Sequence, residues 1–243
     1  MITIYKILLY IFFGILPALI WLSYYLKKDA HPEPKRMILK IFLWGSFVTL
    51  PVFLAQLGLS SLLDKLELPT FIISILYWFL VIAFTEEFFK YLVVRIKVLN
   101  NQNLDEPVDM MIYMIVSALG FAALENVLYL FSPADNLSFN QVLNNTLIIS
   151  FVRFIGATFL HTLASGILGY FLAVETYKMK KNGWFLFSGL MLATTLHGLY
   201  NFSVMTFRGT SQITVPVTIL VGLAIFVLWA FNRVKQMKSV AEV

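Results

Sequence analysis

The chain has 243 residues, of which 60% are hydrophobic and only 13% charged, and its mean hydropathy is +0.83. Soluble domains are about half apolar and a quarter charged, so this composition excludes a soluble globular domain and indicates an integral membrane protein. Cysteine is absent, which excludes disulfides, thiolate metal ligands and a cysteine nucleophile. The net charge of +5 is explained by the loops between spans, so we expect a lipid bilayer and no nucleic acid as partner.

Apolar segments fill nearly the whole chain and predict an all-α, polytopic bundle of about seven transmembrane helices, since about 20 apolar residues cross the hydrocarbon core. The first segment lacks a basic n-region and a small-residue cleavage site, so we expect a retained span rather than a signal peptide. The polar segment 60–69 is predicted to lie in the membrane interface, and 132–145 is predicted to be a turn-rich loop. The spans are expected at about Met1–Leu26, Met37–Leu59, Thr70–Val94, Met110–Phe131, Thr146–Tyr177, Trp184–Phe207 and Val215–Phe231.

No internal repeat or low-complexity tract divides the chain. We therefore expect one domain over residues 1–243, with its polar core at about 70–207.

The loop charges predict the orientation. With seven spans, 13 of the 18 Lys and Arg residues fall on the side that the positive-inside rule assigns to the cytoplasm. This distribution predicts the N-terminus outside and the C-terminus in the cytoplasm. The 13 residues are Lys27, Lys28, Lys35, Arg36, Lys40, Arg95, Lys97, Lys178, Lys180, Lys181, Arg233, Lys235 and Lys238.

The third span contains three ionisable residues, Glu86, Glu87 and Lys90, in an otherwise apolar run. Each charged side chain at the centre of such a helix costs roughly 2.5–3.5 kcal/mol on insertion scales, so intramembrane ionisable residues indicate a functional site that faces protein or water. Glu86 and Lys90 are four residues apart and share a helix face, and an intrahelical ion pair is the structural alternative.

The next three spans continue the pattern. The fourth carries Glu125 and Asn126, the fifth His161, and the sixth His197 and Asn201. One polar pocket shared by four helices would satisfy these groups, because a lone polar side chain finds no partner in hydrocarbon. Read singly, Asn126 and Asn201 favour interhelical hydrogen bonding, and Arg153 of the fifth span favours a structural role.

Two mechanisms fit this set. In the first, Glu86 or Glu87 activates water for attack on a peptide carbonyl, and histidine or asparagine stabilises the oxyanion. In the second, zinc bound by His161, His197 and a glutamate, Glu125, lowers the pKa of its water, and another glutamate is the base. The chain lacks the local His-Glu-x-x-His signature of zinc proteases, so separate helices would have to assemble a metal site.

In this order, the motifs resemble those of the PrsW-type intramembrane proteases, which are related to CAAX prenyl endopeptidases and bacteriocin-processing membrane proteins. The family's EExxK, FxxxEN and HxxxN motifs match residues 86–90, 121–126 and 197–201, and His161 falls in its histidine-containing third motif. That motif usually has glycine four residues after the histidine, where this chain has Ser165.

The resemblance implies a hydrolase of the bacterial cytoplasmic membrane that cleaves single-pass membrane proteins, such as an anti-sigma factor in first-site cleavage. By carry-over, Glu86, Glu87 and His161 are the leading catalytic residues. Glu125, His197 and Asn201 complete the pocket, and Lys90 positions a glutamate. Metal-dependent and metal-free mechanisms both stay open within the wider group. A proton-coupled transporter and a non-catalytic membrane scaffold are the alternatives, although a transporter predicts inverted repeats, which the sequence does not show clearly.

Overall fold

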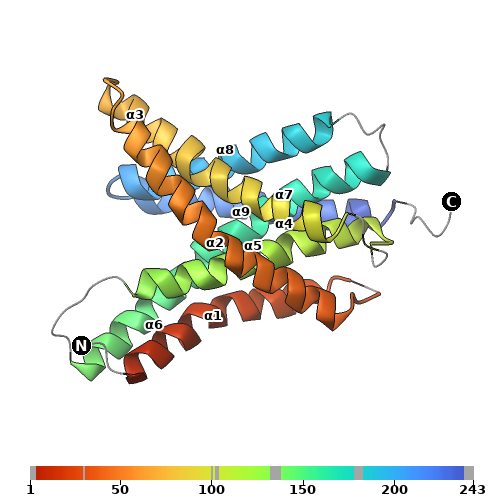
Figure 1. The fold of residues 1–243 in the computed structure, drawn as a ribbon, viewed down its shortest axis with the longest axis horizontal. Helices are drawn as coiled ribbons and strands as arrows, with labels where there is room; N and C mark the ends of the chain where they lie inside the picture. The colour runs from red at the N-terminus through yellow and green to blue at the C-terminus, as the bar shows by residue number, and fades with distance from the viewer. Residues whose placement is uncertain are drawn as a thin grey trace.

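The computed structural model describes residues 4–29, 31–99, 101, 104–131, 138–177 and 183–237, and these residues are helical almost throughout (Figure 1). No strand occurs among the described residues, which confirms the predicted all-α fold. One short segment, η1, is a π-helix. The elements are α1 (Ile4–Leu26), α2 (Lys35–Leu63), α3 (Thr70–Leu76), η1 (Tyr77–Phe84), α4 (Thr85–Lys97), α5 (Pro107–Leu130), α6 (Phe139–Ile155), α7 (Ala157–Tyr177), α8 (Trp184–Thr206) and α9 (Ser211–Val234).

Because α3, η1 and α4 follow one another directly, and α6 and α7 are separated only by Gly156, the described residues form seven helical stretches at the seven predicted places. Six of these stretches are long and apolar enough to cross a membrane. The stretch outside that set is α8, which has 23 residues but carries polar groups such as His197 and Asn201.

Several helices extend a few residues beyond the predicted spans, and two of these extensions enter segments that were predicted as loop or interface. Residues 139–145, predicted as loop, form the first turns of α6, because Ser138 and Gln141 cap its N-terminus: the backbone N–H of Ser138 donates to Gln141 Oε1 at 2.9 Å. The rest of that predicted loop, apart from Ser138, lies outside the described residues. The helix α2 extends to Leu63, so the first residues of the predicted interfacial segment are also helical.

The helix α5 is the centre of the bundle, and 20 of its 24 residues are buried. It packs against α1, α2 and α7, and its crossing with α2 is very close. A Cβ added at Gly120 would overlap the carbonyl oxygen of Phe42, and one added at Gly45 would overlap that of Ser117. Ser46 Oγ also donates to the carbonyl oxygen of Gly120 at 2.7 Å. Small residues therefore set this crossing, as is common between membrane helices.

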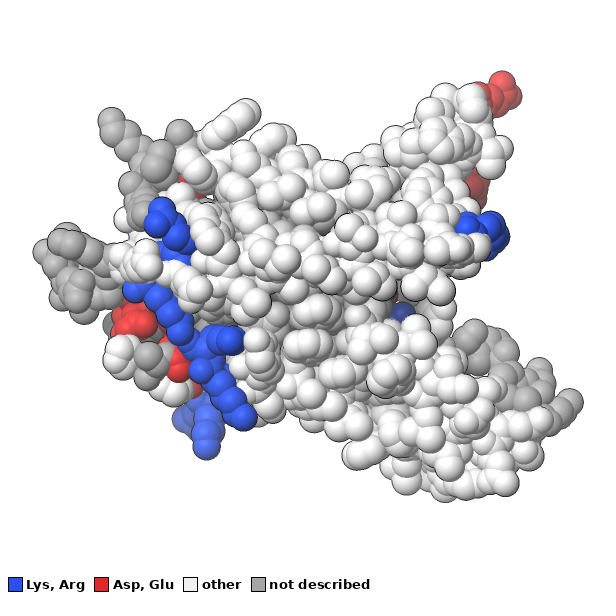
Figure 2. Space-filling view, turned by 180° about the vertical axis from the view of Figure 1, so that it is seen from behind, with Lys and Arg blue, Asp and Glu red and all other residues white. Residues whose placement is uncertain are grey.

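Charged side chains are unevenly distributed along the long axis of the molecule. Figure 2 shows a broad uncharged surface between two ends, with most of the Lys and Arg side chains gathered at one end. At that end lie the connection from α1 to α2, the end of α4 and the end of α9 (Figure 1). Large apolar side chains such as Leu54, Phe71 and Ile225 are exposed, as expected for contact with lipid. The predicted loop residues Lys178, Lys180, Lys181 and Lys238 lie outside the described residues.

Candidate active site

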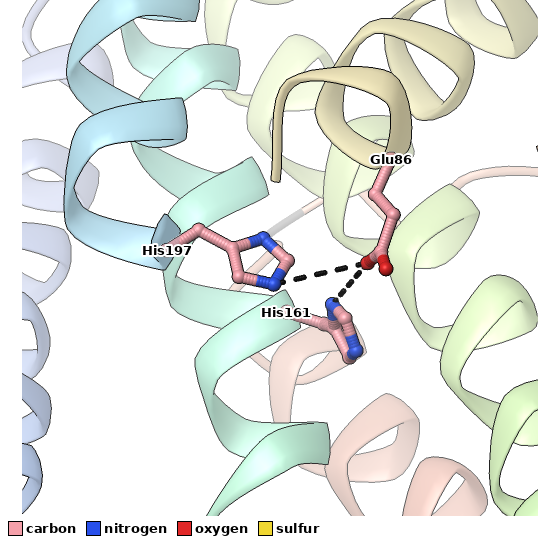
Figure 3. A group of neighbouring side chains, drawn as sticks. All are labelled: Glu86, His161 and His197. Carbon is pink, nitrogen blue, oxygen red and sulfur yellow. Dashed lines mark ion pairs between the residues drawn. The ribbon is translucent and has the colours of Figure 1, made fainter. Parts of the chain in front are cut away.

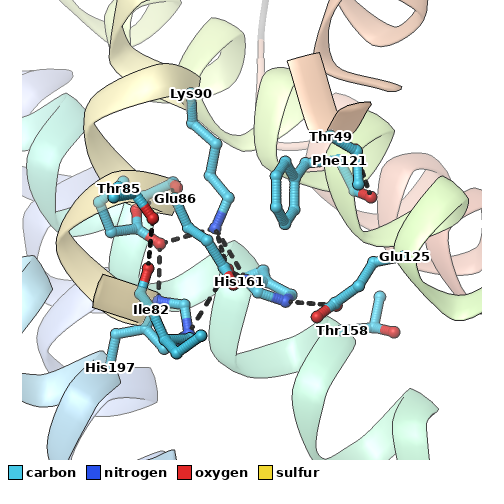
Figure 4. A network of polar contacts seen from close by, with 12 residues as sticks. Thr49, Ile82, Thr85, Glu86, Lys90, Phe121, Glu125, Thr158, His161 and His197 are labelled. Carbon is cyan, nitrogen blue, oxygen red and sulfur yellow. Dashed lines mark hydrogen bonds and ion pairs between the residues drawn. The ribbon is translucent and has the colours of Figure 1, made fainter. Parts of the chain in front are cut away.

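The ionisable residues predicted from four spans meet in one buried cluster near the middle of the bundle (Figure 4). Glu86, Glu87 and Lys90 come from α4, Glu125 from α5, His161 from α7 and His197 from α8. Glu87 and Lys90 have no exposed surface, and the two histidines are at most 2% exposed. The helices therefore assemble the polar groups around one another, away from lipid.

The π-helix η1 leads directly into this cluster. Its eight residues, Tyr77–Phe84, end immediately before Thr85, whose hydroxyl donates to the carbonyl oxygens of Val81 at 2.6 Å and Ile82 at 3.0 Å. A π-helix is rare, and its wider turn changes which residues share a helix face. The acids Glu86 and Glu87 come after it, in regular α-helix, so their predicted spacing to Lys90 is retained.

Glu86, His161 and His197 form the group best suited to hold a metal ion (Figure 3). His161 Nδ1 and His197 Nε2 each lie 3.7 Å from the same oxygen, Glu86 Oε2, and one ligand atom from each residue lies within 4.8 Å of the others. Two imidazoles and a carboxylate are a typical protein ligand set for catalytic zinc. The metal ligands predicted from sequence were His161, His197 and Glu125. In the structure, Glu86 takes the place of Glu125 as the third member of the group.

Hydrogen bonds to the other acids fix which histidine nitrogens face Glu86. Glu125 Oε2 lies 3.0 Å from His161 Nε2, and Glu87 Oε1 lies 2.9 Å from His197 Nδ1. Because an ionised carboxylate only accepts hydrogen bonds, these nitrogens carry the protons. In neutral rings the remaining nitrogens, His161 Nδ1 and His197 Nε2, are then the ones able to act as ligands. Carboxylates commonly orient metal-binding histidines in this way.

Lys90 supplies the positive charge at the centre of the cluster. Its Nζ donates to Glu87 Oε1 at 2.8 Å and lies 3.5 Å from Glu86 Oε2. It also lies 2.8 Å from His161 Nδ1, and as a donor it requires that nitrogen to be unprotonated. The ammonium group stands 4.5 Å from the centre of the Phe121 ring. Lys90 therefore agrees with the histidine tautomer that Glu125 indicates, and its ammonium group would have to release His161 Nδ1 for that nitrogen to bind a metal.

Arg153 is the second cation of the cluster. It binds Glu125 Oε2 through its terminal nitrogen at 2.6 Å. Counted with ionised glutamates and neutral histidines, the three acids and the two cations Lys90 and Arg153 would give the cluster a net charge of −1. The donor atoms and this charge both suit a divalent cation.

A pocket of about 450 Å³ opens beside the cluster and reaches the side of the bundle. Glu86, Glu125, His161 and His197 line it, whereas Glu87 lies behind them with no exposed surface. Figure 2 shows a notch between two lobes of the molecule, with a basic side chain visible inside. Residues of α2, η1, α5, α6, α7 and α8 supply the walls, and most of them are apolar: Trp78, Ile82, Ile148, Ile149, Val152, Val204 and Met205, with Gln56, Tyr129, Arg153, Ala157, Leu160, Tyr200 and Asn201.

The two predicted asparagines have different surroundings. Asn201 lines the pocket. Asn126 is buried, donates to Thr158 Oγ1 at 3.0 Å and to the carbonyl oxygen of Gly14 at 3.2 Å, and accepts from Arg153. Asn126 thus joins α5 to α1, α6 and α7, the interhelical role that its sequence context favours.

Sequence reasoning missed two polar partners of the acids. Gln56 of α2 donates to Glu86 Oε1 at 3.2 Å, and Ser165 of α7 donates to Glu87 Oε2 at 2.7 Å. Ser165 stands where the resemblance led us to expect glycine, so the departure supplies a hydrogen bond within the cluster. Gln56 gave no signal, because a single glutamine near the end of a span resembles an interfacial residue.

Comparisons with known proteins show the family that the sequence motifs resemble. The description "PrsW family intramembrane metalloprotease" belongs to a family model that matches residues 33–230. The chain is 31% identical to Protease PrsW of Oceanobacillus iheyensis over 226 residues, which are 92% of this chain and 94% of that protein. It is 30% identical to Protease PrsW of Geobacillus kaustophilus, covering 94% and 92% of the two chains, and 28% identical to that of Bacillus subtilis, covering 93% of each. No solved structure matches the chain.

Proposed function

Because the chain belongs to the PrsW family of intramembrane metalloproteases, it is a membrane-embedded peptidase, and we propose that its chemistry takes place at Glu86, His161, His197 and Glu125. The observation that carries this proposal is the pair of histidines, each oriented by its own glutamate, that direct their other ring nitrogens toward Glu86 at 3.7 Å. Neither a transporter nor a scaffold requires that arrangement.

Glu86, His161 and His197 would hold the metal ion, with zinc the ion that this donor set favours. When bound, such an ion lowers the pKa of water and polarises a carbonyl oxygen. Glu87 and Lys90 then act as positioning residues. Glu87 fixes the His197 ring, and Lys90 neutralises Glu87 within the buried cluster.

Two acids line the pocket, Glu86 and Glu125, and Glu125 does not belong to the metal group. We assign Glu125 the role of general base. Its side chain is 31% exposed in the pocket, and its Oε2 forms a 2.6 Å ion pair with Arg153 that holds the carboxylate in place. Glu125 accepts a proton from water as the water oxygen bonds to the peptide carbonyl carbon. The same proton then passes to the amide nitrogen as the carbon–nitrogen bond breaks.

The pocket supports a membrane-embedded segment as substrate. Its walls are mainly apolar, and it opens at the side of the bundle, where a substrate could enter from the lipid. A single-pass membrane protein, such as an anti-sigma factor in first-site cleavage, would present such a segment.

The charge distribution supports the predicted orientation of the chain in the bacterial cytoplasmic membrane. Basic side chains gather at the end where α4 and α9 finish, so that end would face the cytoplasm of a bacterial cell, within its cytoplasmic membrane, with the N-terminus outside. Glu125 lies 18 residues after Pro107, about 27 Å along α5 from that end at 1.5 Å per residue. Its site would then lie in the outer half of the bilayer, which suits cleavage near an ectodomain.

A comparison of new protein N-termini in membrane fractions tests this function. Cells would carry the wild type, Glu125→Gln, or the exposed control Asp64→Asn at equal protein levels. We expect cleavage near the membrane boundary of single-pass proteins with the wild type and the control. With Glu125→Gln, it should fall by about 10²–10⁴-fold, the typical contribution of a general base. Identical N-termini in all three samples under several envelope stresses would refute the protease function.

A further inference from the structure

A second group of acidic residues lies at the basic end of the molecule, well away from the candidate active site. It contains Asp29 and Glu33 from the connection between α1 and α2, Asp105 and Glu106 before α5, and Asp109 in its first turn. Asp29, Glu106 and Asp109 each offer one ligand atom within 4.8 Å of the others, and so do Glu33, Asp105 and Asp109. Asp109 thus joins both groups. It lies 16 residues before Glu125, about 24 Å along α5.

Two carboxylate oxygens in this acidic group are buried and unpaired. Asp29 is 8% exposed and Glu33 9%, and neither Asp29 Oδ2 nor Glu33 Oε1 has a hydrogen-bond partner. A buried polar atom without a partner costs about 1–3 kcal/mol, and coordination to a cation would remove that cost. Asp29 belongs to the first three-residue group and Glu33 to the second, so each group contains one buried, unpaired carboxylate oxygen.

Within the described ranges, the acidic group is held by backbone N–H groups, one tyrosine hydroxyl and one histidine. Asp109 Oδ2 accepts the backbone N–H groups of Asp105 at 3.2 Å and Glu106 at 2.7 Å. The Asp29 carboxylate accepts the backbone N–H of His31 at 2.9 Å, and Tyr113 donates to Glu33 Oε2 at 2.6 Å. His31 Nδ1 lies 2.6 Å from Glu106 Oε1. Although Lys and Arg are abundant at this end, none of those in the described ranges forms an ion pair with the five acids.

We propose that these five carboxylates bind a hard divalent cation, Mg²⁺ or Ca²⁺, through Asp29, Glu33 and Asp109 with Asp105 and Glu106 beside them. Both ions prefer carboxylate oxygens, and Ca²⁺ accepts six to eight oxygen ligands in irregular geometry. The bound cation fastens the α1–α2 connection to the start of α5, the central helix of the bundle. This site is independent of the proposed proteolytic chemistry.

Thermal unfolding of the purified, detergent-solubilised full chain tests the site. After chelation and dialysis, Mg²⁺ or Ca²⁺ is added to the wild type, Asp29→Asn, Glu33→Gln and Asp64→Asn. We expect a rise in Tm for the wild type and for Asp64→Asn, whose aspartate is exposed at the opposite end of α2. Asp29→Asn and Glu33→Gln should need at least about tenfold more cation for the same rise.

The difference in stability between Asp29→Asn and the wild type, measured without divalent ions, separates ion binding from a purely structural role. Without divalent ions, Asp29→Asn should be at least as stable as the wild type, because it relieves repulsion among carboxylates.

Terbium provides a second readout, since its luminescence is sensitised by nearby tyrosine and Tyr113 contacts Glu33. The wild type should show emission that Ca²⁺ or Mg²⁺ displaces, and the more effective competitor identifies the ion. An unchanged wild-type Tm with no displaceable emission, or equal responses in wild type and Asp29→Asn, would overturn the proposal.

Discussion

His161 and His197 meet edge to face, with ring centroids 5.0 Å apart and an interplanar angle of 79°, and each directs one nitrogen to the same oxygen of Glu86. The two rings come from different helices, α7 and α8, and each is held from behind by a different glutamate. The metal group is therefore supported on both sides before any ion binds. Such preorganisation is expected of a metal site that performs chemistry.

Metal removal should abolish proteolysis. We expect the purified wild type to contain about one zinc per chain, to lose activity on dialysis against a chelator and to regain it with zinc. His161→Ala and His197→Ala should lose the metal, because each removes one of the three ligands. His31→Ala is the matched control, since His31 is the third histidine of the chain and lies away from the active site, with its Nδ1 2.6 Å from Glu106 Oε1. Metal analysis and cleavage assays measure both effects. Activity that survives in metal-free protein would favour the mechanism based on glutamate and water alone.

Glu86 and Glu87 are adjacent, but their substitution should have different consequences. Glu87 is fully buried and binds Lys90, His197 and Ser165, so Glu87→Gln leaves a buried ammonium group poorly compensated. The expected loss of stability is about 3–5 kcal/mol, the typical effect of breaking a buried ion pair. Glu86 lines the pocket and is 3.5 Å from Lys90, so Glu86→Gln should destabilise the protein less while lowering metal content more. Denaturant unfolding and zinc analysis of both variants measure the difference, and equal stability losses would contradict it.

The sequence predicted which residues belong together but not how they divide their roles. Four ordered motifs on four spans led to the cluster that the helices form, because intramembrane charge is costly and has few tolerated arrangements. Spacing along each helix could not show that Glu86 faces the pocket and Glu87 the interior, since this depends on the rotation and tilt of α4 after η1. The π-helix itself has no clear signal in its uniformly apolar sequence.

Ser165 should stabilise Glu87. Its hydroxyl is the partner of Glu87 Oε2, so Ser165→Ala leaves a buried carboxylate oxygen without a hydrogen bond and should cost about 1–3 kcal/mol. Ser203→Ala is the matched control, because Ser203 is also buried but donates only to the carbonyl oxygen of Tyr200 within α8. Denaturant unfolding compares the two. A loss at Ser203 as large as that at Ser165 would show that the hydroxyl adds nothing specific to Glu87.

Substrate entry from the side of the bundle can be tested by narrowing the pocket without changing the ionisable residues. Val152 of α6 lines the pocket and is 57% exposed, so a larger side chain can be accommodated there without disturbing the core. Val152→Trp should hinder the approach of a membrane segment. We expect a several-fold lower kcat/KM for a membrane-embedded substrate, with unchanged zinc content and Tm.

Val221→Trp provides the control for that experiment. Val221 is 53% exposed on α9, a nearly equal exposure, and lies outside the lining of the pocket. Both variants add one tryptophan to an exposed apolar surface, so a general effect of bulk on membrane insertion would appear in both. If Val152→Trp cleaves the substrate as efficiently as Val221→Trp does, the substrate does not pass α6 at this position, and entry from the side of α6 is excluded. If only Val152→Trp is impaired, the apolar wall of the pocket is the surface along which the substrate reaches Glu125.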